Sequence, residues 1–508
     1  MLLPLLLLVL TAVLAVVLYK QAYERPPNFP PGPPRLPVWG SYWLLLLQDA
    51  CWLYRSAWAM ADRYASKVIG FYLGAFPTVV VHGPELTREM FNRAEFAGRP
   101  DTVLTRVRAF GKRRGLFFTD GAFWVEQRRF ALRHLRDFGF GRRMACAEDT
   151  LRDEVEELLA LVRGECDDQE VASRGCVLLP HALHVPFVSL LWSMFAGRRF
   201  TRAEHAQVRA VSKAAATFVR NVDPMGGAVS QTPWLRHLAP KATGFHGVKT
   251  AGAVLTGLVK AALDEHVKDF NMDEAPRDFI DHYLAQITRD KADGVDCAST
   301  FCEEQLQVMG ADMLLAAATT TTGTVTFALN WLSRRPALQR RCQAQLDAVV
   351  GRARLPSLDD RASLPFVEAV LRETLRRNTM LPLAMPHLTV EDTKLDGYDI
   401  PKNTLIFANV NSAHMDKDYW GDPEEFRPDR FLDEKGELLR RDVTMPFGAG
   451  KRLCPGETFS RQSMFVVLAA LLQNFWFELA SDKVTPDCCL PGLTLTPKDT
   501  WMRATPRA

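Results

Sequence analysis

The sequence carries little net charge and no organised cysteine array. Its formal net charge is +3 over 508 residues, which is too small to favour nucleic-acid binding. None of the 10 cysteines belongs to a C-x-x-C pair or to a cysteine–histidine array with zinc spacing, so a structural zinc site is not expected. Cysteines scattered through a chain of this length also do not form a disulfide framework, which fits a reducing, cytosol-facing environment.

The sequence also lacks repeats of 20–50 residues, and no low-complexity tract follows residue 40. Its composition, 47% hydrophobic and 24% charged, is ordinary for a globular protein, and single enzyme domains reach this size. Helical periodicity dominates, for example over 149–162 and 301–334, whereas strand-like pieces are confined to 67–83 and 385–407. The predicted fold is mostly α with minor β.

No charge interrupts residues 2–18, LLPLLLLVLTAVLAVVL, and no basic residue precedes them. These 17 positions are just enough to cross a bilayer as a helix. A secretory signal peptide usually has a basic start and a small-residue cleavage site. Instead, the run is followed by Tyr19, Lys20 and Arg25. These residues favour a retained membrane anchor at residues 1–19, with the body on the cytoplasmic side, rather than a cleaved signal.

Residues 20–40 are rich in proline, which forbids a continuous helix and favours a stiff polyproline segment. This hinge is either a plain linker or a spacer that orients a catalytic domain on the membrane. The catalytic domain is then predicted to span 41–508.

One cysteine near the C-terminus, in the stretch PFGAGKRLCPGE, stands among glycines and basic residues. Gly448 and Gly450 permit positive φ and a close approach of the backbone to another group. Cys454 lies at the start of a helix predicted over 456–474, where free N–H groups favour an anion and lower the pKa of a thiol. Arg452 is suited to bind a carboxylate with its guanidinium fork.

Gly456 leaves space for a flat ligand beside this cysteine. An iron macrocycle with propionates and an axial thiolate satisfies all these features together. Two alternatives are a buried cysteine next to a turn and a cysteine nucleophile with a histidine partner.

The complete pattern is Phe447-x-x-Gly450-x-Arg452-x-Cys454-x-Gly456, in which five specified residues within ten positions make a chance match very improbable. With this pattern the sequence resembles the cytochrome P450 family. The resemblance implies the cytochrome P450 fold around a buried haem b, with Cys454 as the iron ligand and the other four residues in the cofactor-binding loop.

Other segments follow the family's order along the chain. Glu373-x-x-Arg376 matches its helical ion pair, and Arg430 in FRPDRF implies a Glu–Arg–Arg cluster that holds the core around the haem. Trp124 and Arg128 in FWVEQRR match a helix whose tryptophan and arginine reach a haem propionate; otherwise they are an ordinary surface aromatic and cation.

His387 is the candidate for a second propionate contact, although a single histidine is usually structural.

The long helix at 301–334 departs from the family pattern Ala/Gly-Gly-x-Asp/Glu-Thr. Thr320 matches the catalytic threonine, which the family uses to hydrogen-bond dioxygen or a proton-carrying water, but Ala317 replaces the glycine and Thr319 replaces the acid. A methyl group narrows the space where the helix opens, and a hydroxyl is no proton reservoir. Asp312 lies two turns earlier and is expected to contribute only through water.

Three functions fit this departure. The first is a haem-thiolate monooxygenase with a modified proton relay. The second is a haem-thiolate isomerase or dehydratase that needs no external electrons, and the third is a noncatalytic protein that binds haem and a ligand.

Apolar segments at 106–118, 380–386 and 490–495 resemble substrate-lining regions and favour a lipophilic substrate such as a hormone-like lipid, a steroid, a fatty acid or a xenobiotic. The stretch FWVEQRRFALRHLRDFGFGR resembles arthropod members of the animal microsomal group. That resemblance implies the endoplasmic reticulum (microsome) membrane as location and an NADPH-dependent flavoprotein reductase as electron donor. Candidate cations for the reductase-docking face are Lys451, Arg128, Arg129 and Arg133.

Overall fold

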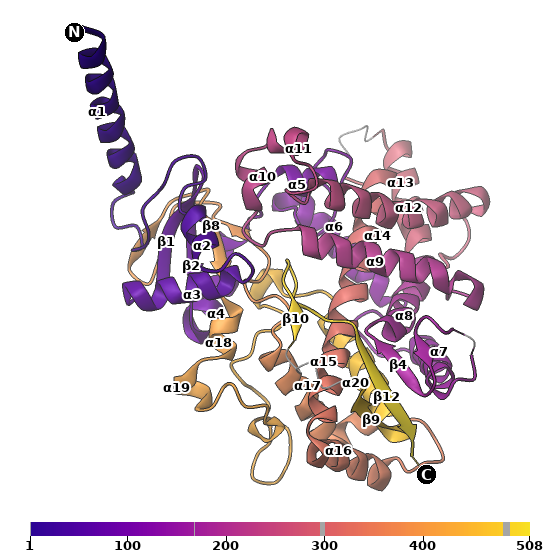
Figure 1. Cartoon of the computed structure of the whole chain (residues 1–508). Helices are drawn as coiled ribbons and strands as arrows, with labels where there is room; N and C mark the ends of the chain where they lie inside the picture. The colour runs from indigo at the N-terminus through magenta and orange to yellow at the C-terminus, as the bar shows by residue number, and fades with distance from the viewer. Residues whose placement is uncertain (1, 167, 295–299, 481–487, 508) are drawn as a thin grey trace.

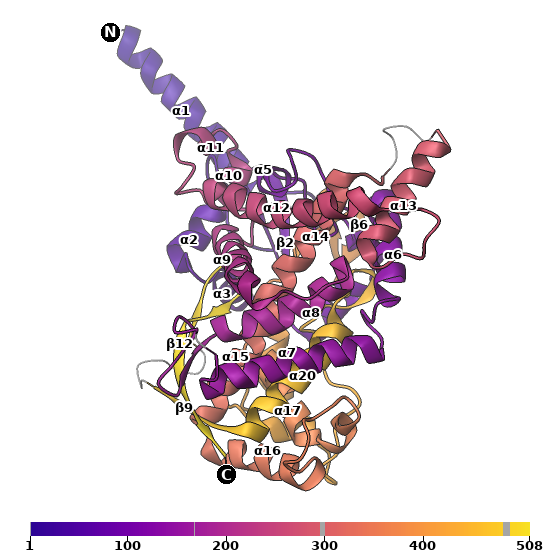
Figure 2. The same cartoon turned by 90° about the vertical axis from the view of Figure 1, so that its right-hand side faces the viewer.

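The structure is a computed structural model that describes residues 2–166, 168–294, 300–480 and 488–507. Helices make up most of it (Figures 1 and 2), which confirms the predicted mostly helical fold with a minor sheet. The helices of the body are α2 (Tyr42–Asp49), α3 (Leu53–Tyr64), α4 (Pro84–Asn92), α5 (Val103–Val107), α6 (Gly121–Arg136), α7 (Ala145–Arg163), α8 (His184–Ala196), α9 (His205–Asn221), α10 (Gly227–Gln231), α11 (Leu235–Leu238), α12 (Phe245–Asp269), α13 (Phe279–Ala292), α14 (Glu303–Ala316), α15 (Thr322–Ser333), α16 (Pro336–Val349), α17 (Pro365–Arg377), α18 (Val410–His414), α19 (Lys417–Trp420) and α20 (Glu457–Asn474).

Strands form two four-stranded sheets and two short hairpins among the described residues. The first sheet has the order β1-β2-β8-β5, in which β2 and β8 are parallel and the other pairs are antiparallel. The second has the order β3-β4-β12-β9. The strands are β1 (Val68–Leu73), β2 (Phe76–Val81), β3 (Ala172–Ser173), β4 (Cys176–Leu179), β5 (His387–Leu388), β6 (Thr393–Leu395), β7 (Tyr398–Ile400), β8 (Leu405–Ala408), β9 (Phe475–Leu479), β10 (Cys489–Leu490), β11 (Thr496–Pro497) and β12 (Thr500–Pro506).

Apolar periodicity accounts for the helices that carry the core. In α7 the predicted stripe is buried on one face, from Leu151 to Val162, and the helix ends at Gly164, whose φ of 79° suits a residue without a Cβ. Helix α20 is buried along almost its whole length because it is apolar on all sides. It packs against α7, α16 and α17 and thereby holds its own N-terminus in the interior.

The N-terminal run forms helix α1 (Leu2–Tyr23), which projects away from the body (Figure 1). Within the described parts of the chain, no helix combines the length and the apolarity that a membrane span requires. The predicted anchor is therefore not confirmed.

The proline-rich segment that follows lies against the first sheet. The guanidinium of Arg25 donates hydrogen bonds to the carbonyl oxygens of Gly32, Pro33 at 2.7 Å and Gly70 at 3.3 Å, and burial lowers the pKa of this arginine. A Cβ on Gly32 would lie 2.1 Å from the Gly70 carbonyl oxygen, so only glycine permits this contact with β1. Arg25 thus ties the segment to the sheet.

The helix predicted over 301–334 is interrupted by a π-helical turn. Helix α14 ends at Ala316, the turn covers Ala317–Thr321, and α15 continues to Ser333. The whole element runs through the middle of the core, and π turns of this kind occur often at functional sites.

Candidate functional site

The loop that carries Cys454 is held at both ends by backbone hydrogen bonds. The N–H of Cys454 donates to the Phe447 carbonyl at 2.9 Å, and the N–H of Leu453 donates to the Gly450 carbonyl at 3.1 Å. Helix α20 begins three residues after the cysteine, at Glu457, as the sequence predicts. The loop therefore places the thiol beside the first turn of a buried helix.

Two of the loop glycines adopt the predicted positive φ, 74° at Gly448 and 63° at Gly450. A Cβ on Gly450 would lie 2.1 Å from the Phe91 carbonyl oxygen at the end of α4, so this position requires glycine for two reasons. Gly456 differs, because a Cβ there would make only ordinary contacts, at 3.7 Å or more, with the surrounding protein. Protein packing does not explain that glycine, and its predicted role of leaving room for a flat ligand stays a prediction.

The environment of the thiol differs from the expectation. Burial raises the pKa of Cys454 to about 11, and the opposing hydrogen bond from the Gly456 N–H is too weak to reverse the effect. The prediction that the helix start lowers this pKa is wrong, because desolvation outweighs the Gly456 hydrogen bond and the charge of Arg128. A metal ion bound to this thiol would remove its proton.

Arg452 lies in a pocket of cations and aromatic rings. Its Nε donates to the Ala97 carbonyl at 2.9 Å, and its guanidinium stacks 3.6 Å from the centre of the Trp124 ring. Burial, together with Arg128 and Arg113, lowers its pKa to about 10, although Asp120 acts in the opposite direction. Arg452 is thus a desolvated cation with little anionic compensation from the protein.

Helix α6 positions the predicted pair Trp124 and Arg128. Trp124 is buried, and the guanidinium of Arg128 lies 5.3 Å from its ring centre. Nη2 of Arg128 donates to the carbonyl of Leu453 at 2.5 Å, directly before the cysteine. Burial lowers the pKa of Arg128, and the neighbouring Cys454 opposes that shift. The structure therefore brings both predicted residues to the cysteine loop.

His387 on β5 lies on another side of the same cluster. It is fully enclosed, and its Nδ1 is 2.7 Å from the Phe96 carbonyl, so this nitrogen carries the proton and donates it. Burial, followed by the charges of Arg99 and Arg452, lowers its pKa well below the usual value. His387 is neutral here, and its role toward a propionate stays a prediction.

Arg99 is a member of this cluster that the sequence did not reveal. Its side chain is buried and donates to the carbonyls of Phe117 at 3.1 Å and Pro386 at 2.8 Å. Burial and the charge of Arg452 lower its pKa far below the ordinary value. A single arginine in an irregular stretch carries no local signal, and only the tertiary fold brings it to the cysteine loop.

The charges of this cluster test whether a haem fits. Arg99, Arg128 and Arg452 are desolvated together, and the carboxylate of Asp120 opposes the lowering of the pKa of Arg99 and Arg452. Asp120 already forms an ion pair with Arg113 at 2.8 Å and accepts a hydrogen bond from the backbone N–H of Arg99 at 2.7 Å. A ligand with two carboxylates supplies the missing negative charge, so the residues present fit an iron macrocycle with propionates.

The Glu–Arg–Arg cluster forms as predicted and is fully buried. Both carboxylate oxygens of Glu373 accept from Arg376, at 2.7 and 2.8 Å, and one of them also accepts from Arg430 at 3.2 Å. Arg376 donates further to the carbonyls of His414 and Pro423. These bonds join α17 to the segment that precedes the cysteine loop, so the cluster holds the scaffold of the site.

Thr320 lies in the π-helical turn, where the helix opens although Ala317 replaces the family's glycine. Its hydroxyl donates to the Ala316 carbonyl at 3.0 Å, and Thr319 bonds in the same way to Leu315 at 2.9 Å. Thr326 on the regular helix α15 makes the same kind of bond, to the Thr322 carbonyl at 2.8 Å, so these bonds are not specific to the π turn.

Asp312 performs a different task from the expected proton relay. Its carboxylate pairs with the buried Arg108 and accepts the N–H groups of Leu116 at 2.8 Å and Phe117 at 3.2 Å. Burial raises its pKa, against the opposing influence of Arg108 and the two N–H groups. Asp312 thus fastens the segment 108–117 to α14, and its carboxylate is occupied by that segment.

Asp312→Asn is expected to lower the free energy of unfolding by about 2 kcal/mol, since Arg108 loses a charge-assisted partner while buried. The matched control is Asp101→Asn, which removes an exposed aspartate from a pair with Arg106 and is expected to cost less than about 0.5 kcal/mol. Chemical denaturation measures both variants. Equal losses would contradict the role of Asp312.

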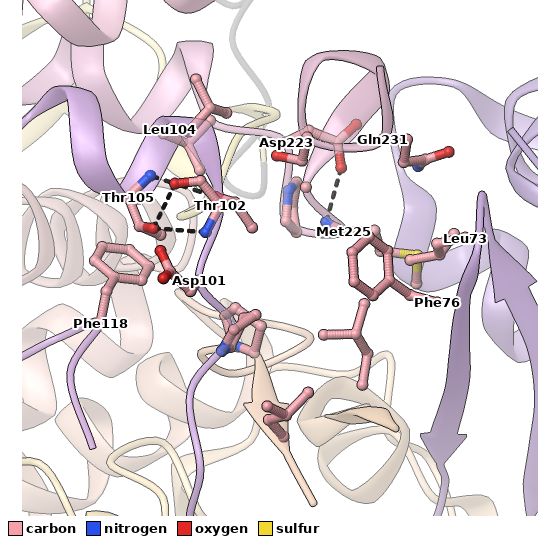
Figure 3. A pocket seen from close by; sticks show the side chains of 18 of the residues that line it. Leu73, Phe76, Asp101, Thr102, Leu104, Thr105, Phe118, Asp223, Met225 and Gln231 are labelled. Atoms are coloured by element: carbon pink, nitrogen blue, oxygen red, sulfur yellow. Dashed lines mark hydrogen bonds between the residues drawn. The ribbon is translucent and has the colours of Figure 1, made fainter. Parts of the chain in front are cut away.

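A cavity of about 380 Å³ lies between the first sheet, α5, the end of α9 and α10 (Figure 3). Each of the three segments predicted to line a substrate site contributes to it, through Phe118, Pro386 and Leu493. In Figure 3, Phe118 and Thr105 lie on one side of the cavity, and Phe76 and Met225 lie on the other. Its wall is mainly apolar.

Some polar groups at this cavity are bonded within the protein, whereas Ser230 and Gln231, which also line it, have buried polar atoms without a hydrogen-bond partner in the described chain. The hydroxyls of Thr102 and Thr105 accept each other's backbone N–H groups, at 2.9 and 3.3 Å (Figure 3). Asp223 accepts from the Met225 N–H at 2.7 Å and from the Tyr42 hydroxyl. The cavity therefore offers a ligand a mainly apolar wall and the polar atoms of Ser230 and Gln231.

Comparison with known proteins decides the family. The family model described as cytochrome P450 matches residues 30–502. The chain belongs to the cytochrome P450 family. Farnesoate epoxidase of Bombyx mori is 33% identical over 472 residues, covering 92% of each chain. Probable cytochrome P450 305a1 of Drosophila melanogaster is 34% identical and covers 94% of each. Cytochrome P450 2U1 of Bos taurus is 32% identical and covers 97% of this chain and 92% of the relative.

This membership makes the protein a cytochrome P450 monooxygenase, an oxidoreductase whose cofactor contains haem iron. The predicted resemblance to arthropod members is confirmed. When bound, a haem with a thiolate ligand supplies the activation of dioxygen and the transfer of one oxygen atom to an organic substrate.

The residues of the chain provide the surroundings for that chemistry. Arg99, Arg128 and Arg452 would hold the propionates of a bound haem, and Cys454 would bind its iron. The cluster around Glu373 keeps these groups in register. The π turn presents the Thr320 hydroxyl at an interruption of the long helix, where it can hold or pass a proton.

Proposed function

We propose that the protein inserts one oxygen atom from dioxygen into a lipophilic small molecule, using haem b bound through Cys454. The observation that carries this proposal is the convergence of desolvated arginines on the loop of a half-buried cysteine, where Arg128 bonds to Leu453 and Arg452 stacks on Trp124. Trp124, Arg128, His387, Phe447, Gly450, Arg452 and Gly456 are proposed to hold the cofactor, and Thr320 is proposed as the catalytic residue.

The proposed substrate is a hormone-like lipid, a steroid, a fatty acid or a xenobiotic. The apolar cavity supports this class, since its threonine hydroxyls are already engaged by the backbone. The relative named farnesoate epoxidase makes long-chain terpenoid acids and their esters the first compounds to test.

The proposed electron donor is an NADPH-dependent flavoprotein reductase. The cysteine loop exposes Lys451, and helix α6 exposes Arg129 and Arg133. These exposed cations support a basic docking face. Arg128 is less suited to docking, since it is half-buried and bonded to Leu453. The proposed arrangement has the catalytic domain, 41–508, on the cytoplasmic side of the endoplasmic reticulum membrane, with 1–19 as its membrane contact and 20–40 as the hinge. It is supported by the uncharged run 2–18.

The test is reconstitution of the full chain with reductase, NADPH and candidate lipids. The product is expected to contain one atom of ¹⁸O from labelled dioxygen and to form only when NADPH is present. A rearranged product formed without NADPH would support the isomerase or dehydratase alternative instead, and the absence of any product with bound ligand would support a binding protein.

Thr320→Ala is expected to reduce product formed per NADPH consumed by roughly tenfold or more, because it removes a hydroxyl that can pass a proton. The control is Thr326→Ala, which deletes an equivalent hydroxyl-to-carbonyl bond on α15, beyond the π turn. Measuring NADPH, dioxygen and product in parallel gives the coupling ratio. If both variants keep the wild-type ratio, Thr320 is not the catalytic residue.

A further inference from the structure

Two histidines and one aspartate meet where the end of α6 lies against α13. His134 and Asp137 are three residues apart at the C-terminal end of α6, and His282 comes from α13. One potential ligand atom from each of the three residues lies within 4.8 Å of the other two. The two helices contact each other, as the views in Figures 1 and 2 agree.

The hydrogen-bonding capacity of this group is not used by the protein. Nδ1 of His134 is buried and has no hydrogen-bond partner within the described chain. The nearest carboxylate oxygen, on Asp137, is 3.8 Å away, which is too far for a hydrogen bond. The rings of His134 and His282 lie 4.1 Å apart at an angle of 31°. A buried ring nitrogen without a hydrogen-bond partner is destabilising, and a bound ligand would supply the missing interaction.

The charges next to this group are of both signs. Asp137 brings a carboxylate beside the two rings, and Arg133 and Arg289 are the neighbouring cations. The carboxylate supplies the negative charge that a metal cation requires from its ligands.

A second group of the same residue types provides a contrast. Nε2 of His266 lies 2.6 Å from Asp278, and the Asp281 carboxylate is held by Arg277 at 2.7 and 2.9 Å. These side chains satisfy one another as a network of ion pairs. A metal ion would have to break that network, so this group serves as a control.

We propose that His134, Asp137 and His282 bind one divalent transition-metal ion of the zinc class. Two imidazole nitrogens and one carboxylate oxygen are the donors that Zn²⁺, Ni²⁺ and Cu²⁺ prefer, whereas Mg²⁺ and Ca²⁺ require more oxygen ligands. Bonds to such an ion are about 2.0–2.2 Å long, so the three ligand atoms, now within 4.8 Å of one another, would converge by rotation of their side chains. Asp137 is about half exposed, which leaves the remaining coordination position open to water.

The metal would join α6 to α13 without a covalent bond. Because α6 also carries Trp124 and Arg128, binding at its end stabilises the helix that contributes to the cysteine site. The proposal does not depend on the oxidation chemistry and adds a second ligand class to the protein.

The test uses the full-length, haem-loaded protein without a histidine tag. Zn²⁺ affinity is measured by competition with a fluorescent zinc indicator, and bound zinc is counted by mass spectrometry after gel filtration. We expect one equivalent of zinc, at least tenfold weaker binding in His282→Gln and in Asp137→Asn, and unchanged binding in His266→Gln. Millimolar Mg²⁺ is expected not to compete.

Three outcomes would overturn the proposal: wild-type affinity in both His282→Gln and Asp137→Asn, loss of binding in His266→Gln, or no wild-type binding below 1 mM Zn²⁺. Asp137→Asn changes an exposed side chain and is therefore the variant that keeps the fold. Thermal scans in chelator, together with the haem absorbance, check that each variant is folded before the titration. A zinc-dependent rise of the melting temperature in the wild type, absent in Asp137→Asn, gives an independent readout.

Discussion

Replacing Cys454 by alanine is expected to lower turnover by more than about 100-fold. It is also expected to abolish the shifted Soret band of the reduced haem with carbon monoxide bound. Removing a residue that merely supports a metal ligand typically costs about 10- to 100-fold, so losing the ligand itself should cost more. The band shift depends on a thiolate bonded to iron and is therefore a direct spectroscopic readout. Difference spectra and product formation under saturating reductase measure the two effects.

The control for this variant is Cys146→Ala, which removes an exposed thiol on α7 and is expected to keep both the band and the activity. Haem content per protein, measured by pyridine haemochrome, separates loss of the ligand from loss of the whole cofactor. An unchanged Soret band of the carbon monoxide complex in Cys454→Ala would mean that another residue binds the iron.

Glu373→Gln is expected to reduce the free energy of unfolding by about 3–5 kcal/mol, or to prevent accumulation of folded protein. It removes the negative charge that compensates the buried guanidinium groups of Arg376 and Arg430. Removing one partner of a buried ion-pair network is among the single substitutions that destabilise a protein most. The measurement is denaturant unfolding, followed by intrinsic fluorescence and haem absorbance.

Another Glu-x-x-Arg sequence provides the matched control. Glu85 and Arg88 have the same spacing on α4 but are exposed, so Glu85→Gln is expected to change stability by less than about 0.5 kcal/mol. If Glu373→Gln is as stable as this control, the buried cluster does not hold the scaffold together.

The parts of the site that the sequence predicted correctly are encoded locally. Positive φ at Gly448 and Gly450 follows from the residue type, and α20 follows from an apolar run after Pro455. The pair Glu373 and Arg376 lies one turn apart on a helix, so spacing alone places the two side chains together.

Other features depend on tertiary structure and could not be predicted from the sequence. Arg99 belongs to the cluster only because the chain before α6 folds back to the cysteine loop. The pKa of Cys454 was predicted in the wrong direction, because burial cannot be judged from a helix start. Asp312 has a suitable spacing from Thr320, but a buried arginine far along the chain determines where its carboxylate points.

The π turn shows how a local departure is accommodated. Ala317 replaces a glycine that would make an opening easy, and the predicted consequence was a narrower space. The helix opens nevertheless at Ala317–Thr321, and hydroxyls at Thr319 and Thr320 bond to the preceding carbonyls. A glycine at position 317 is thus not required for the π turn in this chain.

The most direct test of this account is X-ray absorption at the iron edge of the resting, full-length protein. The account predicts one sulfur atom among the atoms bonded to iron, contributed by Cys454 and missing in Cys454→Ala. A spectrum that requires only nitrogen and oxygen around the iron in the wild type would contradict it.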